Sequence, residues 1–98
     1  MVNIKCAMDK VAKHIVFIGQ VQGVGFRFVA HSLANRYGIT GFVRNCFDGT
    51  VEMFVQGAAE TIDECIRDVK ENFSGYIKEA IIEEAPIDPR YKEFKITF

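Results

Sequence analysis

The stretch HIVFIGQVQGVGFRFVAHSLANRYG, residues 14–38, places a strand, a glycine-rich loop and a helix in direct succession. Residues 14–18 form an apolar, β-branched run that is typical of a buried strand, and Gly19 closes it. From Phe26 onward apolar residues recur at helical spacing on one face, and Gly38 stands where a glycine commonly follows a helix. The change of period at the glycines therefore predicts a strand–loop–helix unit.

A hairpin is predicted after this helix. Residues 39–46 and 51–56 are the two expected strands, and the turn between them, Phe47-Asp48-Gly49-Thr50, contains the Asp-Gly pair that is typical of hairpins. Gly57 is expected to end the second strand.

A second helix and two further strands complete the pattern. Apolar residues return at helical spacing in residues 62–73, and Thr61-x-x-Glu64 has the sequence of a capping box at the start of that helix. Residues 78–85 resume strand character, and residues 94–98 alternate as a short final strand.

This order of elements predicts an α+β fold of the ferredoxin-like kind: βαββαβ plus a short C-terminal strand, an antiparallel sheet with two helices on one face. With 98 residues the chain has room for one core, so we expect one domain over residues 13–98. Residues 1–12 show no clear period and are expected to form a loose N-terminal extension. The fold plan alone indicates no activity, since it serves enzymes, RNA-binding modules and regulatory domains.

Composition narrows the function. The net charge is −1 and no basic stripe is present, which argues against a nucleic-acid-binding protein. No apolar run is long enough to span a membrane, so no membrane partner is expected. The cysteines lack the spacing of a disulfide framework or a zinc site, so we expect free thiols in a cytoplasmic monomer without metal or cofactor. They are Cys6, Cys46 and Cys65.

The glycine-rich loop has the features of an anion site. Gly19, Gly23 and Gly25 lie between the strand and the helix, and glycines with positive φ let successive backbone N–H groups point inward as a nest. The helix that follows adds its unpaired N–H groups and the positive end of its dipole. Arg27, in the first helical turn, is able to bind two oxygens of one group at once. These features predict a phosphate site, although a glycine-rich turn that only joins strand to helix remains the alternative.

Asn45 is expected to face this loop. A right-handed crossover makes the first two strands parallel, so their C-terminal ends lie at the same edge of the sheet. The third strand is expected between them, which sets a separation of roughly 10 Å across which Arg27 and Asn45 face one another. The alternative is that Asn45 is merely a turn residue.

Two motifs closely resemble the signatures of the acylphosphatase family. The first is Gly19-x-Val21-Gln22-Gly23-Val24-x-Phe26-Arg27, and the second is Gly41-x-Val43-x-Asn45-x-x-x-Gly49. Val51-Glu52 and Gln56-Gly57 also look like that family's third strand, and the resemblance runs from Lys13 to Phe98.

The resemblance implies a metal-free enzyme that hydrolyses small acyl phosphates to a carboxylate and inorganic phosphate. In that family the arginine grips the phosphate and the asparagine positions the attacking water, which assigns these catalytic roles to Arg27 and Asn45. The phosphate-binding backbone then comprises Gly19, Gln20, Val21, Gln22, Gly23 and Val24. Cys46 and Phe98 stand where the family commonly has threonine and tyrosine, and the former puts the fine positioning of Asn45 in question.

Other interpretations stay open at this point. His14 and His31 are rival candidates for a base or a phosphohistidine. The N-terminal domain of a hydrogenase-maturation protein shares the fold and the motif, so a carbamoyl-phosphate-handling module is an alternative. We expect a stand-alone hydrolase, because the sequence shows neither the zinc fingers nor the transferase of that longer protein. A non-catalytic ligand-binding domain is the third interpretation, but it has no need of Arg27 and Asn45 at one edge.

Overall fold

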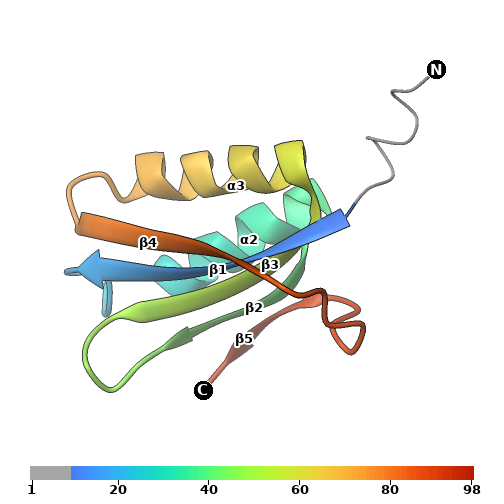
Figure 1. The fold of residues 1–98 in the computed structure, drawn as a ribbon. Coiled ribbons are helices and arrows are strands. Elements are labelled where there is room, and N and C mark those ends of the chain that lie inside the picture. The colour runs from blue at the N-terminus through green and yellow to red at the C-terminus, as the bar shows by residue number, and fades with distance from the viewer. Residues whose placement is uncertain (1–9) are drawn as a thin grey trace.

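A computed structural model describes residues 10–98 and confirms the ferredoxin-like α+β fold. Over these residues a five-stranded sheet, in the order β4-β1-β3-β2-β5, carries both helices on one face (Figure 1). The elements are β1 (Lys10–Gly19), α2 (Phe26–Tyr37), β2 (Thr40–Asn45), β3 (Val51–Ala58), α3 (Ala59–Asn72), β4 (Ile77–Ala85) and β5 (Phe94–Thr97).

The core lies between the sheet and the two helices. Ile15 and Phe17 of β1 alternate toward this layer, and Phe17 pairs across the sheet with Val51 of β3. Aromatic rings join the layers, since the ring centroids of Phe17 and Phe26 lie 4.9 Å apart and those of Phe26 and Phe73 lie 4.6 Å apart. Such tilted ring contacts add to the apolar area that the fold removes from water. They anchor the start of α2 directly behind the glycine loop.

The structure corrects the predicted start of the first strand. Residues 1–9 of the expected extension lie outside the described residues, but residues 10–12 belong to β1. Val11 and Ala12 pair with Gly57 and Gln56 of β3, and Ala12 is buried. The sequence pattern does not reveal these residues, because Lys10 and Lys13 interrupt the apolar run. In the sheet, pairing with β3 satisfies the backbone groups of residues 10–13 whatever their side chains are.

Other predicted boundaries also differ from the structure: the strand predicted over residues 39–46 spans Thr40–Asn45, and the strand predicted over residues 94–98 ends at Thr97. Gly57 does not end β3, which continues to Ala58 because it pairs with the early part of β1. The predicted capping box is absent from α3: the helix begins at Ala59, Ala58 is its N-cap, and no side chain caps it. Thr61 therefore lies inside the first turn, one residue before the apolar stripe starts at Ile62.

The strand directions bring three chain segments to one edge of the sheet. β1 and β2 both pair antiparallel with β3, so they run parallel to each other, and β5 pairs parallel with β2. The prediction of an antiparallel sheet thus holds for β1 to β4, and β5 adds a parallel pair at the margin. The C-terminal ends of β1, β2 and β5 consequently lie at the same edge (Figure 1). This arrangement brings the glycine loop, Asn45 and Phe98 together around one hollow.

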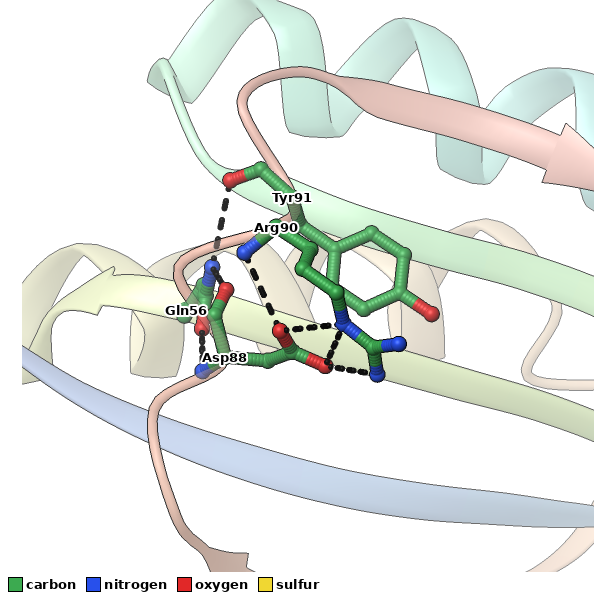
Figure 2. A network of polar contacts seen from close by, with 4 residues as sticks. All are labelled: Gln56, Asp88, Arg90 and Tyr91. Atoms are coloured by element: carbon green, nitrogen blue, oxygen red, sulfur yellow. Dashed lines mark hydrogen bonds and ion pairs between the residues drawn. The ribbon is translucent and has the colours of Figure 1, made fainter.

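A side chain from β3 anchors the connection between β4 and β5. Gln56 is buried, its Oε1 accepts from the N–H of Asp88 at 2.9 Å, and its Nε2 donates to the carbonyl oxygens of Asp88 and Tyr91 (Figure 2). Arg90 binds the Asp88 carboxylate from the outside and holds the pKa of Asp88 below its ordinary value. One buried carboxamide therefore satisfies several backbone groups of this connection.

Candidate active site

The loop between β1 and α2 contains consecutive backbone N–H groups that have no hydrogen-bond partner among the described residues. Gly23 and Gly25 have φ values of 79° and 82°, a conformation that glycine adopts without steric cost. The N–H of Gln20 donates to the carbonyl of Tyr76 at 2.9 Å, whereas no backbone N–H of residues 21–25 donates to another described residue. The donors available to an anion are therefore those that follow Gln20.

The start of α2 adds further donors. Gly25 is the N-cap, and the first helical hydrogen bond runs from the N–H of Val29 to the carbonyl of Gly25 at 3.1 Å. The N–H groups of residues 26–28 precede that bond and have no helical partner. No acidic side chain occupies the first turn, so the positive end of the helix dipole is not neutralised there.

Arg27 and Asn45 line the same hollow. A cavity of about 320 Å³ lies at this sheet edge and is bounded by both residues together with backbone and apolar side chains. Its lining is Val21, Gly23, Gly25, Phe26, Arg27, Phe28, Asn45, Ile96 and Phe98. The sequence-based prediction that Arg27 and Asn45 face one gap is thus matched by the geometry, with Val21 and Gly23 in the same wall.

A second hollow of about 370 Å³ also includes Arg27, Asn45 and Phe98. Gln22, Cys46 and Phe47 also line this one. Three residues of the predicted phosphate-binding set line neither hollow, namely Gly19, Gln20 and Val24. The loop residues that line the hollows are therefore Val21, Gln22, Gly23 and Gly25.

Exposed phenylalanines surround these hollows. Phe28 and Phe98 are 72% and 94% exposed, and Phe47 is fully exposed. The Arg27 guanidinium lies over the Phe98 ring, with 5.4 Å from its central carbon to the ring centroid. Sequence reasoning missed this apolar rim, because Phe28 lies off the buried face of α2, Phe47 is a turn residue, and Phe98 is predicted only as part of the final strand.

The side chain of Gln22 crosses from the glycine loop to the β2–β3 turn. Its Nε2 donates to the carbonyl oxygens of Cys46 at 2.7 Å and of Thr50 at 2.9 Å. Asp48 stabilises the same turn by accepting from the N–H and hydroxyl of Thr50, which lowers the pKa of Asp48. Sequence reasoning assigned Gln22 only a backbone role. Its side chain binds backbone carbonyl oxygens, which every residue type has, so the residue types of the partners do not predict these bonds.

Neither histidine reaches the hollows. His14 lies on the sheet face away from the helices, with its Nε2 2.6 Å from a carboxylate oxygen of Glu52. His31 lies on α2 beside Asn35 and the ring of Phe94. Neither belongs to the residues that line the two hollows around Arg27.

Glu52 forms an ion pair with Arg44, the positively charged residue that directly precedes Asn45 in the sequence. Partial burial raises the pKa of Glu52, but hydrogen bonds from His14 and Arg44 outweigh that effect and hold it below its ordinary value. Arg44 is thereby directed onto the open sheet face, while Arg27 remains the arginine that lines the hollows.

The two described cysteines are free thiols with different surroundings. Cys46 is half-buried at the second hollow, and Cys65 is buried in the core, where desolvation raises its pKa to about 11. Within residues 10–98 no three His, Cys, Asp or Glu side chains gather as a group able to hold a metal ion. No helix in this described range is long and apolar enough to cross a membrane.

The sequence and the fold of this chain are both similar to those of known proteins of one family. The acylphosphatase family model matches residues 13–96. The chain is 40% identical over 83 residues to an acylphosphatase of Bifidobacterium longum. The aligned residues cover 85% of this chain and 69% of that protein. The crystal structure of acylphosphatase from Bacillus subtilis is similar with a TM-score of 0.80 at 25% identity, over 90% of this chain and 99% of that one.

A larger protein contains a similar domain. The crystal structure of full-length HypF in its phosphate- and nucleotide-bound form is similar with a TM-score of 0.81 at 33% identity, over 92% of this chain but 12% of that one. The match to the family model extends over nearly all of the described residues and includes both Arg27 and Asn45. The chain therefore belongs to the acylphosphatase family.

Proposed function

We propose that this chain hydrolyses the carboxyl–phosphate bond of acyl phosphates to a carboxylate and inorganic phosphate, with the phosphoryl group bound between the glycine loop and Arg27. The observation that carries the proposal is that Arg27 and Asn45, from different elements, line one hollow beside unpaired backbone donors. The amides that follow Gln20 and the Arg27 guanidinium bind the phosphoryl oxygens. Asn45 orients the attacking water from the other side.

The chemistry of acyl phosphates requires few catalytic groups. The leaving carboxylate has a conjugate acid with a pKa of roughly 4, so it departs without a general acid. Phosphoryl transfer through a loose transition state depends mainly on positioning and charge stabilisation. Arg27 and the amides stabilise charge on the equatorial oxygens, and the proton of the water passes to a phosphate oxygen of the substrate. No residue outside the loop, Arg27 and Asn45 is needed, and we expect no metal or cofactor.

The apolar rim supports an acyl group with a hydrocarbon body. Phe28 and Phe98 are exposed in the free chain and border the hollow that contains Arg27. An aryl or aliphatic acyl group removes part of this apolar surface from water.

Carbamoyl phosphate is the second candidate substrate. The motif that this chain shares with the carbamoyl-phosphate-handling domain of a hydrogenase-maturation protein supports it. The carbamoyl group is small and polar, however, and gains little from contact with phenylalanine rings. The rim therefore favours an apolar acyl phosphate over carbamoyl phosphate.

Hydrolysis of benzoyl phosphate, carbamoyl phosphate and p-nitrophenyl phosphate by the purified chain tests the proposal. We expect benzoyl phosphate to be the best substrate, the monoester to react negligibly, and a chelator to leave the rate unchanged. Asn45→Ala is expected to lose about 10²–10³ in kcat while it still binds inorganic phosphate. A metal requirement, or a preference for the monoester, contradicts the proposed mechanism; no turnover of any of the three indicates a non-catalytic domain.

A further inference from the structure

Gln22 links the two segments on which the proposed reaction depends. It belongs to the loop that binds phosphate in the proposal, but its Nε2 donates to Cys46 and Thr50, the residues that flank the β2–β3 turn. Cys46 directly follows Asn45, the last residue of β2. The carboxamide of Gln22 is thus one residue along the backbone from the group that orients water.

These bonds are not required to close the turn. The N–H of Cys46 donates to the carbonyl of Thr50 at 2.9 Å, the N–H of Gly49 donates to the carbonyl of Cys46 at 3.1 Å, and Asp48 caps Thr50. The hairpin turn therefore forms through its own hydrogen bonds. The two hydrogen bonds of the Gln22 side chain hold this turn in a set position relative to the glycine loop.

We propose that Gln22 is a positioning residue, whose side chain sets the place of Asn45 relative to the bound phosphoryl group. The inference rests on the proposed function, because it concerns the water that attacks phosphorus. In-line attack requires the water to be held within a narrow range of distance and direction, and a displacement of about 1 Å costs about 10²-fold in rate. In this role the Gln22 carboxamide acts through the backbone of Cys46, because its Nε2 is already bonded to two carbonyl oxygens.

This role predicts a separation between kcat and binding. Gln22→Met keeps the length of the side chain and removes the donor, while the backbone N–H groups of the loop remain. We expect kcat to fall about 10–100-fold. The dissociation constant of inorganic phosphate is expected to stay within about threefold of wild type, because Arg27 and the amides still bind it. Gln22→Asn, whose amide is too short to reach both carbonyls, is the second variant if the first does not fold.

A double-mutant cycle with Asn45→Ala separates positioning from a general structural role. If Gln22 acts through Asn45, Gln22→Met costs little further kcat once Asn45 is removed. Gln56→Met is the matched control, because Gln56 also donates from Nε2 to two backbone carbonyls, Asp88 and Tyr91, but away from the hollows. It is expected to lower thermal stability and leave kcat unchanged at a temperature where it is folded.

The outcomes distinguish this inference from the proposed function. If Asn45→Ala loses kcat but folded Gln22→Met retains it, the inference is wrong and the proposed function stands. An equal loss from Gln22→Met in the wild-type and Asn45→Ala backgrounds also overturns the inference, because it means independent effects. If Asn45→Ala itself retains near-normal kcat, water positioning by Asn45 is wrong, and the role of Gln22 falls with it.

Discussion

The Arg27 guanidinium lies over the ring of Phe98, with 5.4 Å between its central carbon and the ring centroid. Arg27 comes from the first turn of α2, and Phe98 directly follows β5. The ring limits the positions of the guanidinium, so in the proposed phosphate binding by Arg27 less conformational freedom is lost. Phe98 thereby forms part of the wall of the hollow that Arg27 lines.

Phe98→Leu tests this contact. Leucine keeps an apolar side chain but lacks the ring face, and a cation–π contact at an exposed position is worth about 0.5–1 kcal/mol. We therefore expect a fall of about two- to fivefold in the affinity for inorganic phosphate, measured as competitive inhibition. Phe47→Leu, at the same rim but without the contact to Arg27, is expected to leave that affinity unchanged. Equal effects of the two changes indicate that Phe98 acts only as apolar surface.

Arg27→Lys is expected to fail as a conservative change. An ammonium is a point charge and does not reproduce the two parallel hydrogen bonds of a guanidinium to two phosphate oxygens. We expect kcat/KM for benzoyl phosphate to fall about 10²-fold or more, with weaker binding of inorganic phosphate. Arg44→Lys is the control, since Arg44 is paired with Glu52 outside the hollows and its variant is expected to keep nearly full activity. A functional Arg27→Lys enzyme argues that charge alone suffices.

Phe28→Ala separates recognition of the acyl group from recognition of phosphate. The Phe28 ring is exposed beside Arg27, so a substrate's apolar part is able to cover it. Loss of a contact worth about 1 kcal/mol raises KM for benzoyl phosphate about fivefold. Acetyl phosphate, with one methyl group, is expected to show little change. Ile81→Ala, an exposed apolar change on β4, serves as the control, and a similar rise in KM for both substrates contradicts a role in acyl selectivity.

Gln56→Met is expected to destabilise the fold without touching the chemistry. The change leaves the N–H and carbonyl of Asp88 and the carbonyl of Tyr91 without their partner (Figure 2). Loss of a partner for buried polar groups costs about 1–3 kcal/mol, and each kcal/mol lowers Tm by about 4–8 °C in a domain of this size. Arg90→Ala, which removes only an exposed pair with Asp88, is expected to lower Tm far less. Calorimetry of the two variants measures the difference.

Glu52 makes the stability sensitive to acid. Its pKa is lower in the folded chain than its ordinary value, because hydrogen bonds from His14 and Arg44 outweigh burial. A carboxylate with a depressed pKa stabilises the fold above its ordinary pKa, and this stabilisation is lost as the pH falls through the folded value. Wild type is therefore expected to exceed Glu52→Gln in the free energy of unfolding at neutral pH, and the gap is expected to close below about pH 4.5. Asp63→Asn, which breaks the exposed pair with Lys13, is the control. If the difference in unfolding free energy between wild type and Glu52→Gln does not change with pH, the assignment of the acid sensitivity to Glu52 is wrong.

Much of the candidate site could be predicted from local sequence and one topological rule. The glycines, Arg27 and the start of α2 are contiguous in the chain, so their spacing predicted an anion site before any packing was considered. Right-handed crossover then placed Asn45 at the same sheet edge, and the structure has both residues lining one hollow. The predicted boundaries at Gly57 and Thr61 failed because strand pairing, not residue type, decides where β3 ends and α3 begins.

The sequence by itself determined the order of the elements and the apolar faces that form the core, and it predicted the residues that bind phosphate in the proposal, because each depends on short-range periodicity or residue chemistry. Only the tertiary structure decided that β5 pairs parallel with β2, and so brought Phe98 over Arg27. It alone showed that the Gln22 side chain binds the carbonyls of Cys46 and Thr50. Contacts of this kind join distant parts of the chain, and a backbone carbonyl is the same at every position, so no pattern of residue types reveals them.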